Sequence, residues 1–178
     1  FYAAGYMRGL AEHDQTRFFA AFAASLSAAV GIAFAENLVT IFIFYELLSV
    51  ATYPLVAHDE DEEARAAGRK YLAYTFFGGG VLVLGGTALV FIMAGTTTFG
   101  ATGEQIAQAD PALAKAAFAL LATGFGVKAG LMPLHSWLPD AMVAPTPVSG
   151  LLHAVAVVKS GVFGIARLVL EVYGPAQM

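Results

Sequence analysis

The sequence predicts an all-α fold, a polytopic bundle of transmembrane helices. Hydrophobic residues make up 58% of the chain and charged residues only 12%, with a mean hydropathy of +0.71. A water-soluble domain usually carries roughly a quarter charged residues, because its surface faces water. The apolar residues gather in stretches of about twenty, the length that crosses the hydrocarbon core of a bilayer. We therefore expect the lipid bilayer to be the solvent of this chain.

Five such stretches predict five spans within a single transmembrane domain, residues 1–178. The predicted spans are residues 18–35, 37–57, 70–94, 113–138 and 147–171. Residues 1–7 resemble the end of an earlier helix, and the chain begins inside an apolar segment with Phe1. We therefore expect this chain to be a fragment of a longer protein.

The fourth span is predicted to be a broken helix. Gly130, Leu131, Met132 and Pro133 interrupt it within the membrane, shortly after Lys128. Non-helical backbone at that depth is tolerated where it is buried in protein or lines a water-filled cavity. The break therefore favours a hydrated path beside Lys128.

The loops differ in their basic residues, which predicts the topology. Basic residues flank the first two spans on one side: Arg8, Arg17, Arg65, Arg69 and Lys70. The loop 95–112 on the other side contains no lysine or arginine. By the positive-inside rule, loop 58–70 is cytoplasmic in an inner (cell) membrane, and the short loop 139–146 lies on the same side.

Several classes of site have no support in the sequence. There is no cysteine, which excludes disulfides and thiolate metal sites, and the net charge of −4 gives no support for nucleic-acid binding. The acidic run Asp59–Glu63 lacks the glycine and ligand spacing of a calcium loop, so we expect a solvated loop. No catalytic, cofactor-binding or metal-binding motif is present. His13 and His58 are expected to be solvated loop residues.

Three charged residues lie where charge is expensive. Glu46 is near the middle of the second predicted span, and Lys128 and Lys159 lie at depths of roughly 20 Å in the fourth and fifth. A central charge costs about 2.5–3.5 kcal/mol even on the mild insertion scale. Such residues usually mark a polar pathway or proton relay; the alternative is a Glu46–Lys128 ion pair that only fixes the order of the helices. Lysine suits a relay because burial can make it release its proton, which arginine does not do.

Two histidines are weaker candidates for the same relay. His153 lies on the predicted helix of Lys159, where it either carries protons or is a core residue satisfied by a neighbouring group. His135 lies at the break of the fourth span and either takes part in the relay or caps carbonyl groups that the break leaves free.

Three segments carry a resemblance to a known family. They are Phe44-Tyr45-Glu46-Leu47-Leu48-Ser49, the segment from Gly126 through Lys128, Pro133 and Trp137 to Ala141, and the segment from Ala144 through Pro147 to Ala154. Together they resemble the antiporter-like membrane subunits of respiratory complex I, of Mrp-type multi-subunit cation/proton antiporters and of membrane-bound hydrogenases. Tyr53-Pro54-Leu55-Val56 and Val157–Phe163 look closer to the antiporter D-subunit and hydrogenase-type members than to complex I subunits.

The resemblance implies a fold of two inverted five-helix repeats, of which this chain is the first, each with one broken helix. It implies a proton relay of Glu46, Lys128 and His153, with Lys159 where only some members place a central lysine. It also implies other membrane subunits as partners and transport of protons, with Na⁺ or K⁺ as candidate coupling cations. Two function classes stay open: a subunit of an ion-exchanging antiporter, and a pumping subunit of a redox-driven translocase such as NADH-quinone oxidoreductase. A purely structural membrane scaffold is the third reading.

Overall fold

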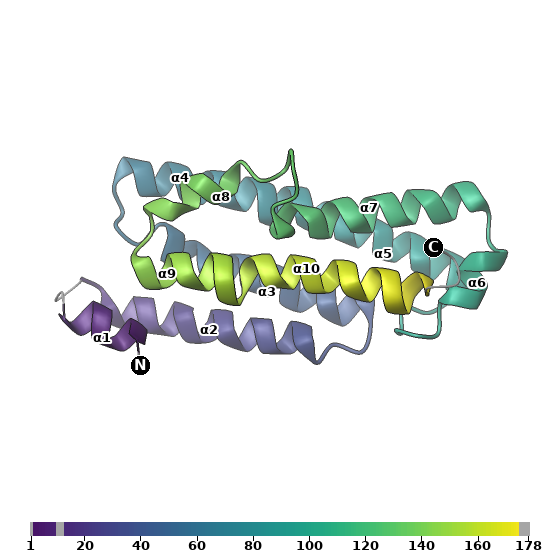
Figure 1. Ribbon diagram of the computed structural model, residues 1–178, viewed down its shortest axis with the longest axis horizontal. Coiled ribbons are helices and arrows are strands. Elements are labelled where there is room, and N and C mark those ends of the chain that lie inside the picture. The colour runs from purple at the N-terminus through teal and green to yellow at the C-terminus, as the bar shows by residue number, and fades with distance from the viewer. Residues whose placement is uncertain (1, 10–12, 175–178) are drawn as a thin grey trace.

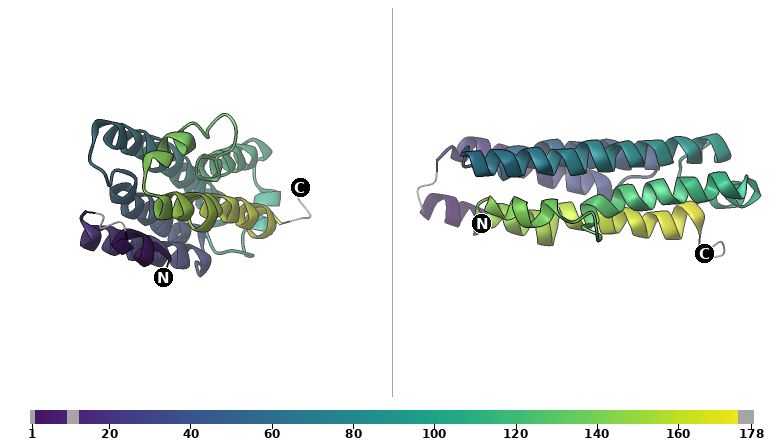
Figure 2. Two further views of the ribbon diagram at one scale, coloured as in Figure 1. Left: turned by 60° about the vertical axis from the view of Figure 1, so that its left-hand side comes forward. Right: turned by 90° about the horizontal axis from the view of Figure 1, so that it is seen from above.

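The computed structural model describes residues 2–9 and 13–174, and every regular element in this part of the chain is a helix. The helices run along one long axis and form an elongated bundle (Figures 1 and 2). In chain order the elements are α1 (Tyr2–Gly9), α2 (Gln15–Ala33), α3 (Leu38–Val56), α4 (Glu62–Leu72), η1 (Ala73–Gly80), α5 (Val81–Ala94), α6 (Gly103–Gln108), α7 (Pro111–Ala129), α8 (Trp137–Asp140), η2 (Ala141–Val143), α9 (Thr146–Gly150), η3 (Leu151–Val155), α10 (Val157–Arg167) and η4 (Leu168–Tyr173).

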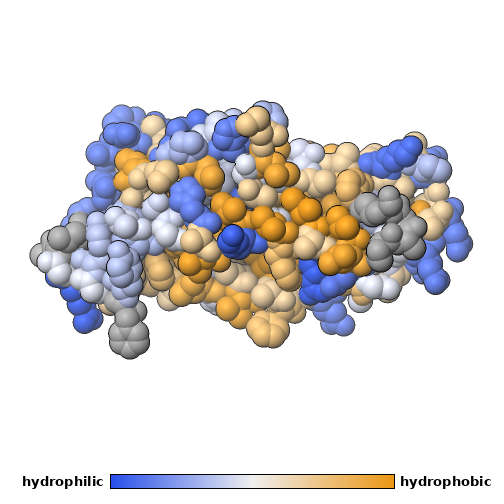
Figure 3. Space-filling view, viewed as in Figure 1, coloured by the Kyte–Doolittle hydropathy of each residue, from blue (hydrophilic) through white to orange (hydrophobic). Residues whose placement is uncertain are grey.

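Within the described residues, four helices are long and apolar enough to cross a membrane. They are α2, α3, the continuous helix formed by α4, η1 and α5, and α7. Hydrophobic residues gather in the middle of the long axis and hydrophilic residues at its two ends (Figure 3). The distribution agrees with the predicted all-α membrane bundle, whose apolar middle faces lipid and whose ends face water.

The third and fourth helices differ in extent from the predicted spans. The third begins at Glu62, well before residue 70, because its first turns form an amphipathic helix. The fourth, α7, ends at Ala129, where Gly130 adopts a left-handed conformation with φ of 71°. Non-helical backbone then leads to α8 at Trp137. The predicted fifth span corresponds to α9, η3, α10 and η4, interrupted at Ala156.

Side chains next to the loops fix where three helices begin. Asn37 and Asp61 each accept a hydrogen bond from the backbone N–H three residues further on, at 2.8 and 2.7 Å. Asp110 does the same for the N–H two residues further on, at 2.7 Å. Such caps contribute about 1 kcal/mol each, so the polar residues between the apolar stretches set the starts of α3, α4 and α7.

The loops gather at the two ends of the bundle as the charge pattern predicts. At one end Lys70 Nζ lies 2.7 Å from Asp140 Oδ2, and Arg17 Nη2 donates to the carbonyl oxygen of His58 at 3.0 Å. At the other end the N–H of Gly100 donates to the carbonyl oxygen of Glu171 at 2.8 Å. Loops 58–70 and 139–146 therefore share one end, whereas loop 95–112 lies at the opposite end.

His58 is not solvated, which corrects the expectation from the sequence. Its exposed fraction is 0%, because its ring stacks on that of His13 with centroids 4.6 Å apart and meets the ring of Phe18 at 5.5 Å. Burial, and after it the neighbouring His13, lower the pKa of His58 below its ordinary value. His13 itself is half exposed, and the acidic run Asp59–Glu63 is exposed as predicted.

Candidate functional site

Lys128, in the last turn of α7, is completely buried. Its Nζ donates a hydrogen bond to the backbone carbonyl oxygen of Tyr45 and lies 3.3 Å from the centroid of the Tyr45 ring. A carbonyl oxygen and an aromatic face both stabilise an ammonium group in a dry environment. Lys128 is therefore held on α3 by the residue next to Glu46.

Tyr45 is itself fixed between α3 and α7. Its hydroxyl donates to the carbonyl oxygen of Gly124 at 2.9 Å, and its ring meets the edge of Phe125 with centroids 5.4 Å apart. The lysine thus docks on a ring and a carbonyl that have little freedom to move.

Glu46 has a different environment from Lys128. Both of its carboxylate oxygens are shielded from solvent, and neither has a hydrogen-bond partner in the described part of the chain. Among the same residues Glu46 and Lys128 form no ion pair, because Lys128 reaches the neighbouring Tyr45 instead. Tyr45 and Glu46 are successive residues of α3, and successive side chains on a helix point about 100° apart. A lysine bound at Tyr45 therefore does not contact the Glu46 carboxylate.

The carboxylate of Glu46 lies against the backbone of η1 at Gly80. A Cβ atom at Gly80 would lie 2.7 Å from Cδ of Glu46, closer than atoms can approach. A side chain at position 80 would therefore push the Glu46 carboxylate away from its present place. The segment η1 is π-helical, and π-helical turns inside α-helices are frequent at functional sites.

A cavity of about 130 Å³ adjoins Glu46 between α3, η1 and α5. Phe42, Phe77 and Val81 contribute to its lining, and Phe77 and Val81 are exposed on the outer face of the bundle. Apart from Glu46, every side chain that lines the cavity is apolar, so the carboxylate is its one charged group. Glu46 therefore has a carboxylate without a partner among the described residues and open space beside it.

A buried pair of hydroxyl groups joins α3 to α4, and the sequence analysis did not predict it. Thr52 Oγ1 and the Tyr71 hydroxyl are 2.6 Å apart, and Thr75 Oγ1 donates to the Tyr71 carbonyl at 2.8 Å. The residues were visible in the sequence, since Ser49 follows Glu46 by three residues and Thr52 follows Ser49 by three more along α3. A search restricted to charges does not find it.

The remaining predicted residues lie outside this contact. Lys159 on α10 is exposed beside a cavity of about 200 Å³ that is lined by Ala29 and Ile32 of α2. In the described part of the chain it has no hydrogen bond or ion pair. His153 in η3 is half-buried, and its Nε2 is buried without a partner among those residues.

His135 lies in the non-helical segment after α7, and its buried Nδ1 has no partner in the described residues either. The carbonyl of Val127 at the end of α7 is instead satisfied by Trp137, whose Nε1 donates to it at 2.8 Å. The indole of Trp137, and not His135, therefore caps this carbonyl group.

Helix α10 approaches α7 closely beside this site. A Cβ atom at Gly161 would lie 2.6 Å from the carbonyl oxygen of Phe125, so only glycine permits this contact. The backbone of the helix that carries Lys159 is thus fixed one turn away from Lys128 along α7.

The sequence profile described as "NADH:quinone oxidoreductase/Mrp antiporter, TM" matches residues 35–177. The chain belongs to this family. The match includes Glu46, Lys128, His153 and Lys159, so the members share the helices that carry these residues. As a member, the chain is a multi-pass membrane protein.

Relatives in the family have two kinds of name. The chain is 35% identical to the A subunit of a Na(+)/H(+) antiporter of Alkalihalophilus pseudofirmus over 85% of its length and 19% of that protein. It is 36% identical to "NAD(P)H-quinone oxidoreductase chain 5" of Synechocystis over 92% of its length and 25% of that protein. The chain therefore spans about a fifth to a quarter of these curated relatives. The antiporter relative is an A-type subunit, and closeness to D-subunits stays a prediction.

Chains from three solved membrane complexes have the same fold as this chain. A chain of respiratory complex I from Thermus thermophilus matches with a TM-score of 0.75 and 26% identity, over 90% of this chain and 36% of that one. A chain of an archaeal membrane-bound sulfane sulfur reductase matches with a TM-score of 0.74 and 30% identity, over 83% and 30%. A chain of the Mrp complex from Dietzia matches with a TM-score of 0.69 and 30% identity, over 79% and 16%.

Proposed function

We propose that this chain forms part of a subunit that moves protons across a membrane in a multi-subunit complex, in exchange for Na⁺ or K⁺. Glu46 and Lys128 are the central groups of its proton path. The observation that carries the proposal is the environment of Glu46, a carboxylate inside a membrane helix with both oxygens unpartnered among the described residues and beside a cavity. Ionisable groups inside membranes usually serve ion or proton pathways.

The structural ion pair is the weaker explanation of these charges. A buried charge kept only for stability is expected to be paired, because removing one partner of a buried pair costs about 3–5 kcal/mol. Lys128 meets a carbonyl and an aromatic ring, and Glu46 meets no partner among the described residues. Among the described residues, neither group is therefore tied up in an ion pair with the other.

A second candidate function is proton pumping within a redox-driven NADH-quinone oxidoreductase. It is favoured by the 36% identity to a quinone oxidoreductase chain over 92% of this chain. Membrane vesicles separate the two functions: an antiporter collapses an imposed pH gradient when Na⁺ or K⁺ is added, whereas a redox pump builds one when NADH is added.

We propose that His153, Lys159 and His135 extend the proton path beyond the Glu46–Lys128 centre. His153 and His135 each have a ring nitrogen that is buried without a partner in the described residues, and Lys159 lies beside a cavity. Each group can therefore take or give a proton without breaking an existing hydrogen bond. Other membrane subunits are the proposed partners, since the relatives are named as parts of larger assemblies.

The proposed function is tested by Glu46→Gln in the intact protein, measured as proton movement in everted vesicles. The amide keeps the shape of the side chain but cannot carry the proton, so transport falls by more than about tenfold. Glu36→Gln removes an exposed carboxylate from the α2–α3 turn and keeps wild-type transport. Normal transport by a correctly assembled Glu46→Gln complex would refute the role of Glu46.

We further propose that the end of the bundle with loop 58–70 is cytoplasmic in an inner cell membrane. Single cysteines at Glu62 and Glu104, both exposed and at opposite ends, can be labelled with an impermeant thiol reagent on intact cells. Labelling at position 104 but not 62 supports this orientation, and the reverse pattern inverts it.

A further inference from the structure

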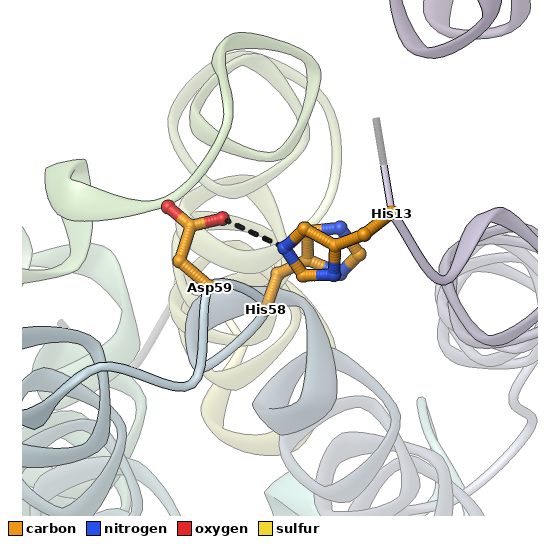
Figure 4. A group of neighbouring side chains, drawn as sticks. All are labelled: His13, His58 and Asp59. Carbon is orange, nitrogen blue, oxygen red and sulfur yellow. Dashed lines mark ion pairs between the residues drawn. The ribbon is translucent and has the colours of Figure 1, made fainter. Parts of the chain in front are cut away.

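A cluster of three metal-ligand side chains lies at the loop 58–70 end, away from the Glu46–Lys128 centre. His13 comes from the α1–α2 connection, and His58 and Asp59 come from the α3–α4 loop (Figure 4). One ligand atom from each residue lies within 4.8 Å of the others. The fold thus brings together residues far apart in the sequence whose side chains can bind a transition metal.

His58 is the residue that points to a ligand. Its exposed fraction is 0%, and both ring nitrogens, Nδ1 and Nε2, are buried without a hydrogen-bond partner in the described residues. Stacking on His13 and contact with Phe18 explain how the ring packs, but neither satisfies its nitrogens. Buried polar atoms normally have partners, and a metal ion beside the ring supplies one.

His13 is oriented like a metal ligand with an outer carboxylate. Its Nδ1 lies 3.3 Å from Asp14 Oδ2, and its Nε2 lies 3.8 Å from Asp59 Oδ1. In many metal sites a ligating histidine donates one N–H to a carboxylate while the other nitrogen binds the metal. Asp14 therefore positions His13 with Nε2 facing Asp59 and the stacked ring of His58.

We propose that His13, His58 and Asp59 form a binding site for a divalent transition-metal ion of the zinc class. Two imidazole nitrogens and one carboxylate suit Zn²⁺, whereas Ca²⁺ and Mg²⁺ require oxygen ligands. In a tetrahedral zinc site the ligand atoms lie roughly 3.3 Å apart and the metal lies in the plane of each imidazole ring. Binding therefore requires the half-exposed ring of His13 to turn out of its parallel stack on His58. Water completes the fourth position.

The neighbouring charges permit a cation at this position. Arg17 is the nearest positive group, and it is already engaged by Glu60 and by Asp14 at 3.5 Å. Asp59 keeps its carboxylate available to a metal, since within the described residues its ion-pair contact is with His13 alone. The local field therefore does not exclude a divalent ion.

A metal at this site would fasten the α1–α2 connection to the end of α3. Helix α3 carries Glu46, so occupancy of the site would restrain the helix proposed to work in transport. The binding site itself does not depend on the proposed transport function, because its ligands lie outside the Glu46–Lys128 contact.

The test is Zn²⁺ binding to the intact protein in its complex, purified in detergent and stripped with a chelator. Titration against a chromophoric chelator, with Co²⁺ absorption as the report on ligand type, should give one site that His13→Ala removes. His13 is half exposed, so this substitution leaves the packed core intact. Asp14→Asn should weaken binding by about tenfold, as outer-shell changes do.

Glu62→Gln is the matched control, because it removes an exposed carboxylate from the same loop region. Glu62 pairs with Arg69 and is not one of the three proposed ligands. It should bind Zn²⁺ like the wild type. If His13→Ala and His58→Ala, both eluting as assembled complexes, bind Zn²⁺ with wild-type stoichiometry and affinity, the site does not exist. Loss of binding in Glu62→Gln as well would mean a non-specific acidic surface and would also overturn the proposal.

Discussion

Charged groups at the ends of the bundle differ from those in its middle. At the ends they pair: Arg17 with Glu60, Arg69 with Glu62, Lys70 with Asp140 and Arg167 with Glu171. In the middle, Glu46, Lys128 and Lys159 take part in no ion pair within the described ranges 2–9 and 13–174. The pairing is thus found where water already solvates the charges and is missing where pairing would stabilise them most.

The difference in pairing suggests different roles for the charges at the ends and in the middle of the bundle. Exposed pairs contribute only about 0–1 kcal/mol, so the end charges mainly keep the loops in water. An unpaired group in a dry, apolar bundle is costly to maintain, and such cost is typical of residues kept for a function. The comparison can be sharpened by changing one member of each class.

The largest effect in this comparison is expected for Lys128. Lys128→Arg keeps a positive charge on a group that does not release its proton. Lys128→Met keeps a similar shape without the charge. If Lys128 passes protons, both should lose transport by more than about tenfold. The measurement is proton movement in vesicles with assembly checked by size-exclusion chromatography.

Lys128→Arg is the decisive member of this pair, because arginine stays protonated in proteins. Normal pumping by Lys128→Arg would make the lysine a fixed electrostatic group. Overpacking at a fully buried position costs about 1–3 kcal/mol, so thermal stability is measured in parallel.

An intermediate effect is expected for Gly80→Ala. The added methyl group would occupy the space of the Glu46 carboxylate and shift it by about 1 Å, enough to slow transport by roughly three- to tenfold. Gly85→Ala in the same continuous helix is the control, since its Cβ would make an ordinary contact at 3.7 Å with Leu120. Equal transport by the two variants would contradict the proposed importance of the Glu46 position.

The smallest effect is expected for Asp140→Asn at the end of the bundle. It breaks the Lys70–Asp140 pair, whose side chains are 36% and 46% exposed. The free energy of unfolding should change by less than about 1 kcal/mol, and transport should stay near the wild-type rate. A loss of transport as large as that for Lys128 would remove the distinction between end and middle.

Much of the fold follows from the sequence because lipid imposes a simple rule. Backbone groups in a bilayer must be satisfied within each segment, so stretches of about twenty apolar residues form helices. The caps Asn37, Asp61 and Asp110 mark where those helices begin. The depths of Glu46 and Lys128 are set by their distance from these boundaries.

The contacts of the site depended on the tertiary structure. The sequence analysis left open whether Glu46 and Lys128 form an ion pair, and the packing of α7 on α3 brings Lys128 to the carbonyl and ring of Tyr45 instead. Gly80 acquires its role only because η1 lies against Glu46.

The sequence by itself determined the solvent, the apolar spans, the grouping of loops at two ends and the depth of Glu46 and Lys128 along their helices. Only the tertiary structure decided which partners those charges have, and that His13 and His58 stack at the end of the bundle. The physical reason is that hydrophobic length and helix period act along one segment, whereas partners depend on the rotation and closeness of neighbouring helices. Those are fixed by contacts between residues far apart in the chain, such as Gly161 against Phe125.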